Sequence, residues 1–252
     1  MLKTILLGIY LIVPVLLFSI LVFPYLLIVW LKLGKWADPY VKSLGAAYSR
    51  HLLWLGGGRV TVRGLENIPA RKDICFISNH QSYVDIPLIV GYIPRLTGFV
   101  AKSELFKVPF LRIWLKALGC VKLNRGSGRS AIAMISEGSK SIRDGHPLVM
   151  FPEGTRMKNK SMDQIQIKSG TSFIAYKFKL PILPIHINWP DKLSKTVLKR
   201  LPVRIKIKPP IIPDKEHIRD YFPERQIMDL PDKEVINLLT PFILKKIQYP
   251  ET

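Results

Sequence analysis

Cysteine is scarce in this chain of 252 residues, which contains only Cys75 and Cys120. Each of the two lies in a short apolar stretch, where a cysteine is ordinarily a small buried hydrophobic residue. A framework of disulfides needs several cysteines at regular spacing, and a cysteine-based zinc site needs them in close pairs. The sequence therefore argues against both, and we expect no metal site.

Acidic residues are also few, since 18 Asp and Glu stand against 38 Lys and Arg. The formal net charge of +20 attracts anions over a long range. Nucleic acid and anionic lipid both carry the charge that such a protein would bind. The sequence has no zinc-finger, RNA-recognition or helix-turn-helix signature, so we expect anionic membrane lipids as partners and no nucleic acid.

Charge is absent from one long stretch near the N-terminus, between Lys3 and Lys32. This apolar run is longer than the ~20 residues needed to cross the core of a bilayer. A signal peptide would have a shorter apolar region and a small-residue cleavage site, which is not evident here. Pro14 and Pro24 interrupt the run, so a kinked crossing and a hairpin within one leaflet both stay open.

The charges that flank this run indicate its orientation. Basic residues follow it at Lys32, Lys35, Lys42 and Arg50, whereas only Lys3 and the amino terminus precede it. The positive-inside rule then places the rest of the chain on the cytoplasmic face of the cell (inner) membrane. Residues 39–55 have apolar side chains at helical spacing, which predicts an amphipathic helix at the membrane surface. We predict a membrane-anchoring helical segment over 1–58 and a globular domain over 59–252.

In the globular part, β-like runs alternate with helical patterns. The β-like runs are 59–64, 73–78, 97–101, 120–124, 147–151, 181–187 and 203–208. The helical patterns are near 83–92, 109–118, 129–143, 169–178 and 233–247. This alternation predicts an α/β fold with a largely parallel or mixed sheet flanked by helices. Functional residues of such sheets gather at the carboxyl ends of the strands. We expect the Pro-rich region 209–231 to cover the surface.

His80 and Asp85 follow the second of these runs. Five residues span ~500° on a regular helix, so the two side chains meet only if a turn lies between them. In that geometry the carboxylate binds one imidazole nitrogen and leaves the other free as a base. The alternative is that Asp85 only caps the helix, at capping-box spacing from Ser82, and that His80 is a solvated turn residue.

A second polar group, Glu153, Gly154, Thr155 and Arg156, directly follows another buried run. A glycine turn with exposed amides followed by an arginine can form a cradle for an anion, although it can also be an ordinary turn. Two further cations, Lys102 and Arg125, follow other β-like runs. Three cations at strand ends near one imidazole favour a site for an anionic ligand.

Four segments of the sequence resemble the ordered motifs of the glycerolipid acyltransferase family, in particular its bacterial 1-acyl-glycerol-3-phosphate acyltransferases. They are NHQSYVD at 79–85, the segment 102–125, FPEGTR at 151–156 and LPILPIHI at 180–187. The resemblance implies an α/β domain on a membrane-embedded helical unit and an acyl-CoA or acyl-carrier-protein donor. It also implies lysophosphatidic acid as the acceptor, and neither a metal nor a redox cofactor.

By this resemblance, His80 would be the general base and Asp85 its orienting partner. Lys102, Arg125 and Arg156 would hold the acceptor phosphate, and Glu153, Gly154 and Thr155 would shape that site. Asn124 departs from the pattern of relatives, which leaves other acceptors open: glycerol-3-phosphate, a lysophospholipid with a head group, or an amino-acid lipid. A non-catalytic, membrane-tethered basic protein is a further alternative. A serine hydrolase is disfavoured because no G-x-S-x-G sequence is present.

Overall fold

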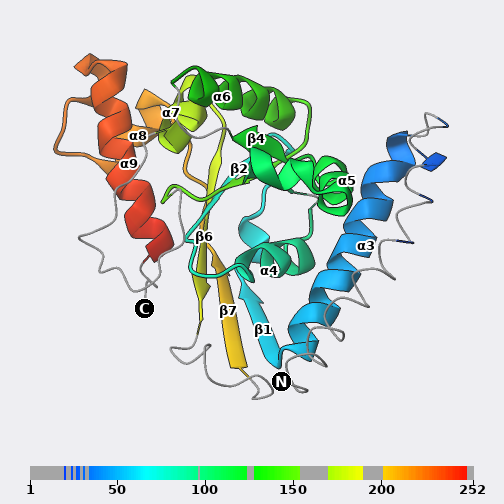
Figure 1. The fold of residues 1–252 in the computed structure, drawn as a ribbon. Coiled ribbons are helices and arrows are strands. Elements are labelled where there is room, and N and C mark those ends of the chain that lie inside the picture. Colours follow the sequence, from blue (N-terminus) through cyan, green and yellow to red (C-terminus); the bar gives the residue numbers. More distant parts are fainter. Residues whose placement is uncertain are drawn as a thin grey trace.

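The computed structural model describes residues 34–95, 97–123, 128–153, 170–189 and 201–248, together with residues 20, 24, 27, 28 and 31. These residues form a mixed sheet with helices on both faces (Figure 1), so the predicted α/β fold with a flanked sheet is confirmed. None of the described helices is both long enough and apolar enough to span a bilayer. Most of the apolar run before residue 34 lies outside the described residues, and its place in the membrane stays a prediction.

The described part of the sheet has seven strands, one for each predicted run. They are β1 Gly58–Arg63, β2 Cys75–Ser78, β3 Gly98–Lys102, β4 Val121–Leu123, β5 Leu148–Met150, β6 Ile182–Asn188 and β7 Leu201–Ile207. Their order across the sheet is β1-β7-β6-β2-β5-β3-β4. Only β6 and β7 pair antiparallel, and all other neighbours are parallel. The carboxyl ends of β2 to β6 therefore lie at one edge of the sheet.

Seven α-helices connect or cover these strands in the described part of the chain. They are α3 Gly34–Leu55, α4 Asp85–Tyr92, α5 Pro109–Ala117, α6 Gly128–Arg143, α7 Gly170–Lys177, α8 Lys215–Tyr221 and α9 Asp232–Gln248. Short 3-10 turns lie at Leu65–Asn67, Ser103–Lys107 and Ile227–Asp229. Helix α8 lies in the Pro-rich region that was expected only to cover the surface. It begins where Asp214 accepts a hydrogen bond from the His217 amide, and it buries Ile218 in the core.

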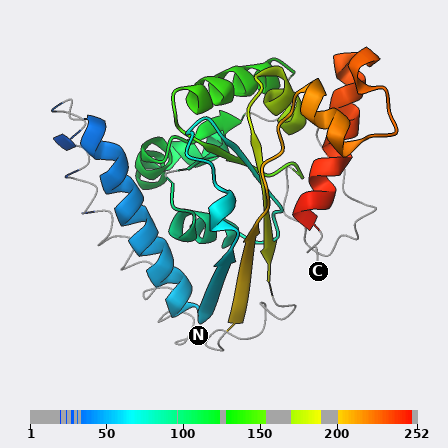
Figure 2. The same ribbon diagram turned by 180° about the vertical axis from the view of Figure 1, so that it is seen from behind.

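The core has two halves because side chains alternate between the faces of each strand. On β2, Cys75 and Ile77 point into one half, which also contains side chains of α6, α7 and α9. Phe76 points into the other half, together with Leu88 and Ile89 of α4. Figure 2 shows the two groups of helices on opposite sides of the sheet.

Helix α3 holds the C-terminal end of α4. Lys42 Nζ donates hydrogen bonds to the carbonyls of Val90, at 3.0 Å, and Ile93, and Arg50 Nε donates to the Gly91 carbonyl at 2.7 Å. The last carbonyls of a helix have no partner within the helix, so these cations satisfy them. Burial lowers the pKa of Lys42 to about 8, and the nearby Arg50 charge adds to this effect. The predicted helix over 39–55 is thus present, while its position at a membrane surface stays a prediction.

Candidate functional site

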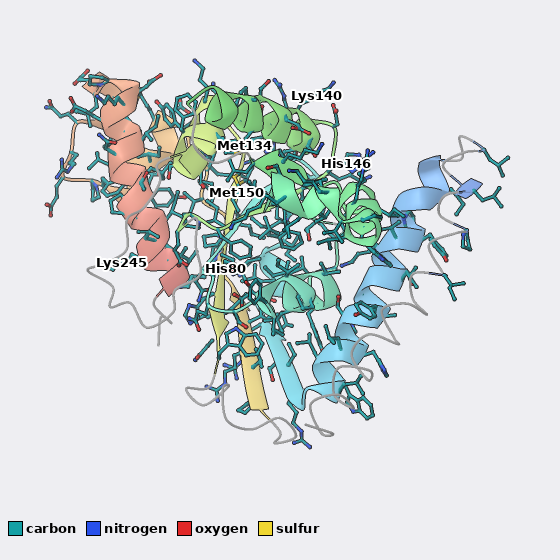
Figure 3. All side chains as sticks on the ribbon, in the orientation of Figure 1. His80, Met134, Lys140, His146, Met150 and Lys245 are labelled. Atoms are coloured by element: carbon teal, nitrogen blue, oxygen red, sulfur yellow. The ribbon has the colours of Figure 1, made fainter. Side chains whose placement is uncertain are left out.

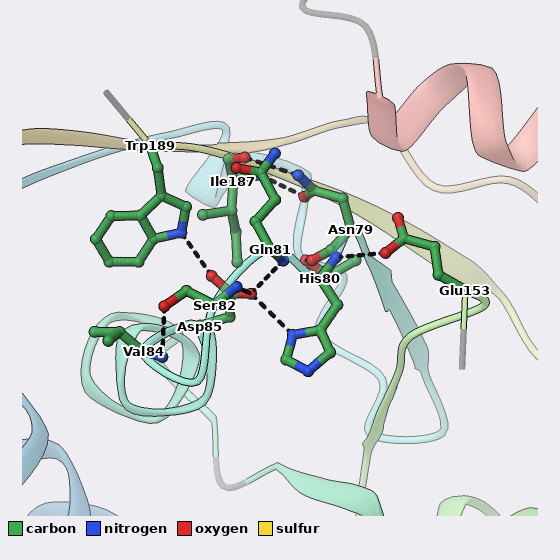
Figure 4. A network of polar contacts seen from close by, with 10 residues as sticks. Asn79, His80, Gln81, Ser82, Val84, Asp85, Glu153, Ile187 and Trp189 are labelled. Atoms are coloured by element: carbon green, nitrogen blue, oxygen red, sulfur yellow. Dashed lines mark hydrogen bonds and ion pairs between the residues drawn. The ribbon is translucent and has the colours of Figure 1, made fainter. Parts of the chain in front are cut away.

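The residues that directly follow three neighbouring parallel strands lie together at one edge of the sheet. Strand β2 lies between β5 and β6 and runs parallel to both. The residues just beyond these strands include His80, Glu153 and Trp189, and Figure 4 shows them around one turn of the chain. Figure 3 shows His80 near the middle of the molecule rather than on an outer loop. The carboxyl edge of the sheet is therefore the candidate site, as the sequence predicted.

His80 and Asp85 form the centre of this site. Asp85 is the first residue of α4 and His80 lies in the turn before it, so the two side chains face each other. The distance between His80 Nδ1 and Asp85 Oδ2 is 2.9 Å, and the side chains are 15% and 0% exposed. The turn between the two residues is the feature that their five-residue spacing required.

The Asp85 carboxylate accepts hydrogen bonds at both oxygens. Its Oδ2 accepts from the backbone amides of Gln81 and Ser82, both at 2.8 Å, as well as from His80. Its Oδ1 accepts from Trp189 Nε1 at 2.6 Å. Burying a carboxylate is costly unless donors surround it, and these four donors offset the cost. Asp85 therefore binds the Ser82 amide at the start of α4 and also pairs with His80, so the alternative of a carboxylate that only caps beside a solvated His80 is wrong.

The second nitrogen of the His80 ring is available for chemistry. When Nδ1–H is donated to the carboxylate, Nε2 carries the lone pair. No hydrogen-bond partner of Nε2 is found among the described residues. The ring stacks on Phe151, with centroids 4.2 Å apart and an angle of 22° between the planes. The imidazole is thus fixed on one side by Asp85 and on one face by Phe151, and Nε2 can act as a base.

Glu153 lies on the other side of His80. Its Oε2 accepts a hydrogen bond from the His80 amide at 3.1 Å, and its buried Oε1 has no hydrogen-bond partner within the described ranges. Burial raises the pKa of Glu153 to about 7, and the nearby Asp85 charge also raises it, while the His80 amide acts in the opposite direction. Glu153 therefore changes its protonation state near neutral pH.

The other predicted site residues are only partly placed. Lys102 is the last residue of β3, at the same edge of the sheet, and its side chain is exposed. In the part of the chain that the structure describes, no hydrogen bond or ion pair joins Lys102 to His80, Asp85 or Glu153. Arg125, Gly154, Thr155 and Arg156 lie outside the described residues. Their predicted role in holding a phosphate stays a prediction.

Two residues of the site were not assigned a role from the sequence. Trp189 directly follows β6, and Asn79 directly follows β2. Both therefore carry the signal used for the other site residues, a polar group at the carboxyl end of a buried strand. Which strand lies beside which was not evident in the sequence, so their contacts were not predicted. Across the described ranges, no three His, Cys, Asp or Glu side chains gather as metal ligands would.

Known proteins are similar to this chain over the segment that carries the site. The 1-acyl-sn-glycerol-3-phosphate acyltransferase of Borreliella burgdorferi is 37% identical over 134 residues, which cover 53% of this chain and 52% of that protein. The enzyme of the same name from Saccharomyces cerevisiae is 32% identical over 130 residues, covering 51% and 43%. The chain thus spans about half the length of the curated relatives it matches.

A solved structure shares the fold over a longer part of the chain. The crystal structure of the 1-acyl-sn-glycerophosphate (LPA) acyltransferase PlsC from Thermotoga maritima superposes with a TM-score of 0.59 and 24% sequence identity. The match covers 89% of this chain and 95% of the other. A family model described as Acyltransferase matches residues 59–188, just over half of the sequence, including His80, Asp85 and Glu153. The chain therefore belongs to the acyltransferase family.

Proposed function

We propose that the protein transfers a fatty acyl chain from an acyl thioester to the sn-2 hydroxyl of lysophosphatidic acid, which gives phosphatidic acid. One observation carries this proposal: Asp85 orients the imidazole of His80 and leaves Nε2 open at the carboxyl edge of the sheet. Relatives of the chain are named for this reaction. A base that is oriented by a carboxylate suits a reaction in which a hydroxyl must lose its proton as it attacks.

In the reaction that we propose, His80 Nε2 removes the proton from the acceptor hydroxyl. The hydroxyl oxygen attacks the thioester carbonyl, and the tetrahedral intermediate then breaks its C–S bond. The leaving thiolate takes the proton from the imidazolium of His80, so the base returns to its starting state. Asp85 stabilises the imidazolium between these two steps. No covalent intermediate on the enzyme is required.

The oxygen of the tetrahedral intermediate needs hydrogen-bond donors. Most backbone amides near His80 are already engaged. The His80 amide donates to Glu153, those of Gln81 and Ser82 donate to Asp85, and that of Val84 donates to Ser82 Oγ. We therefore propose that backbone amides of the glycine turn predicted around Gly154, just after strand β5 in the sequence, bind the oxyanion.

The substrates and the membrane complete the proposal. The donor is an acyl-CoA or an acyl-carrier protein, and Lys102, Arg125 and Arg156 hold the phosphate of the acceptor. Residues 1–58 anchor the protein to the cytoplasmic face of the cell membrane, and residues 59–252 form the acyltransferase domain. The net charge of +20 supports both an anionic acceptor and contact with anionic lipids.

The test uses the purified full-length protein in vesicles that contain anionic lipid. Labelled acyl-CoA and labelled acyl-carrier protein are each offered with lysophosphatidic acid, glycerol-3-phosphate, a lysophospholipid with a head group, or an amino-acid lipid. The expected result is label in phosphatidic acid from at least one donor. Label on a different acceptor would replace the proposed substrate. If folded protein binds the vesicles but transfers no acyl chain to any acceptor, it is a basic binding protein and not an enzyme.

A further inference from the structure

The indole of Trp189 contacts the carboxylate of Asp85 from a distant part of the chain. Trp189 follows β6, 104 residues after Asp85, and its Nε1–H donates to Asp85 Oδ1 at 2.6 Å. An indole N–H is a donor only, so this bond has a fixed direction. The three donors on the other oxygen, Oδ2, all come from residues 80–82 of the adjacent turn. Trp189 therefore holds Asp85 from outside its own turn.

A second tether fixes Trp189 relative to that turn. Asn79 is buried, and its Nδ2 donates to the Ile187 carbonyl at 2.8 Å. The Ile187 amide donates to Asn79 Oδ1, also at 2.8 Å. Asn79 and Asp85 therefore bind β6 and the residue after it at two places, and Figure 4 shows both tethers on the same side of the turn. The strand end that carries the indole is thus bound to the turn at a second point, and the indole N–H meets Oδ1 of the carboxylate.

We propose that Trp189 is a positioning residue of the His80–Asp85 pair. Its N–H binds Oδ1 and thereby stops the carboxylate from rotating, so that Oδ2 stays directed at His80 Nδ1. Without this bond, Oδ1 would be left buried with no partner among the described residues, and rotation of the carboxylate would disturb the bond to the imidazole. This inference rests on the proposed acyl transfer, because the rate of that reaction reports the orientation of His80.

Two substitutions of Trp189 separate its hydrogen bond from its bulk. Trp189→Phe keeps an aromatic ring and loses the donor. Trp189→His loses the six-membered ring, but its imidazole can superpose on the pyrrole ring of the indole and place Nε2–H where Nε1–H was. A residue that only packs is replaced better by phenylalanine, whereas a residue that donates is replaced better by histidine. Tyr221→Phe is the control, since it removes a polar donor from an aromatic ring that lies on α8 and stacks on Phe242, outside the site and the proposed anchor.

We expect Trp189→Phe to lower kcat about ten- to a hundredfold, because this is the range for the loss of a hydrogen bond to a charged group. The KM for the acyl donor and the KM for the acceptor should each change by no more than about twofold. Trp189→His should recover most of the lost kcat when it is assayed at pH 8, where its imidazole is neutral. Tyr221→Phe should have the wild-type kcat. Adding Trp189→Phe to Asp85→Asn should cost little more than Asp85→Asn alone, because both changes act through the same carboxylate.

Several results would overturn the role of Trp189 while leaving the proposed function intact. They are a Phe variant with wild-type kcat, a His variant that is no faster than the Phe variant, and fully additive losses with Asp85→Asn. Thermal unfolding followed by circular dichroism shows whether each variant is folded. If the Phe variant does not fold, the His variant decides: near-normal kcat supports the inference, and a folded but slow enzyme contradicts it. A wild-type protein without acyl transfer would instead overturn the proposed function.

Discussion

Among the residues that the structure describes, two aspartates contact a histidine at the start of a helix, and their surroundings differ. Asp214 caps α8 and accepts from the amide and Nδ1 of His217, the latter at 2.7 Å, but the two side chains are 29% and 52% exposed. Asp85 is fully buried and lies at the edge where β2, β5 and β6 end. A His–Asp contact alone therefore does not identify a catalytic pair. Burial, a second set of donors and the position on the sheet distinguish His80 and Asp85.

The first prediction at the scale of the residue concerns this pair. His80→Ala should lower kcat by about 10²–10⁴, because general base catalysis is lost while binding is retained. Asp85→Asn should also be severely impaired, because an amide favours the wrong tautomer of His80. The double variant should be hardly slower than His80→Ala, since both changes disable one unit. The measurement is kcat for the three variants and the wild type.

The exposed pair provides the control for this experiment. His217→Ala and Asp214→Asn remove a contact of similar length and should leave kcat unchanged. A folded His80→Ala enzyme with near-normal turnover would contradict the mechanism. Strictly additive losses would show that Asp85 acts apart from His80.

A second prediction follows from the buried carboxyl of Glu153. Its pKa rises from the ordinary 4.5 to about 7 in the fold, mainly because of burial. The folded protein therefore binds this proton more tightly than the unfolded chain does. The resulting stabilisation is complete below pH 4.5 and is lost as the pH rises through 7. Glu153→Gln does not titrate, so its free energy of unfolding, relative to wild type, should increase between pH 4.5 and 8 by on the order of 3 kcal/mol.

Urea unfolding of both proteins at pH 4.5, 6 and 8 measures this difference. Glu224→Gln, which removes a carboxylate at an exposed position, is the matched control. A difference between Glu153→Gln and wild type that stays constant over this range would show that Glu153 titrates normally.

The third prediction concerns Arg156, whose role rests on the sequence motif. Arg156→Ala should raise the KM for the acceptor about ten- to a hundredfold, because the phosphate loses a charge-assisted hydrogen bond of roughly 1.5–3 kcal/mol. The KM for the acyl donor should change much less. Arg219→Ala removes an exposed arginine of α8 and is the control. An equal effect on the two KM values would argue against a phosphate role.

At the scale of the elements, the order of the strands decides which residues meet. The turn after β2 lies between the ends of β5 and β6, so it receives Glu153 from one side and Trp189 from the other. Helix α4 continues from this turn, and α3 binds the opposite end of α4 through Lys42 and Arg50. The segment that contains His80 and Asp85 is thus held on both sides and at the far end of its helix.

The element-scale prediction tests the tether between β2 and β6. Asn79→Ala should lower the free energy of unfolding by about 2–4 kcal/mol, because both the amide and the carbonyl of Ile187 lose a buried partner. Urea unfolding measures this change. Asn188→Ala, at an exposed position of the same strand, should change the stability by less than about 0.5 kcal/mol. If the two substitutions have similar effects, the Asn79 tether does not stabilise the fold.

At the scale of the whole molecule, the apolar N-terminal run and the charge of +20 both favour action at an anionic membrane. A variant that starts at Gly34 loses the apolar run and keeps α3, which packs against α4. We expect it to lose most of its activity on lysophosphatidic acid in vesicles, because it is no longer concentrated at the bilayer. Its activity on a short-chain, water-soluble acceptor should be retained.

Rates of acyl transfer for the full-length protein and the shortened variant, on each acceptor, test this expectation. Starting the variant at residue 59 would also remove the contacts of α3 with α4, so the loss of anchoring would be mixed with a loss of stability. Equal rates of the two proteins on vesicles would contradict a role of the N-terminal run in anchoring.

Local patterns in the sequence predicted most of the fold and the centre of the site. Each of the seven β-like runs forms a strand, because a few consecutive residues are enough to show the apolar or alternating pattern of a buried strand. The contact of His80 with Asp85 was predictable for the same reason, since both residues belong to one turn. Helix α8 was not predicted, because the prolines around it indicated a segment without regular structure, although Asp214 is a residue that can cap a helix.

Only the tertiary structure decided which distant residues complete the site. Asn79 and Asp85 meet Ile187 and Trp189 across more than a hundred residues of sequence, because β6 pairs with β2. The raised pKa of Glu153 likewise reflects its burial in the fold and the charge of Asp85, which the fold brings near it. The sequence by itself determined the strands, the turn and the charge, which are local or additive properties. The order of strands arises from packing of the whole chain, and it determined which donors surround the buried carboxylate.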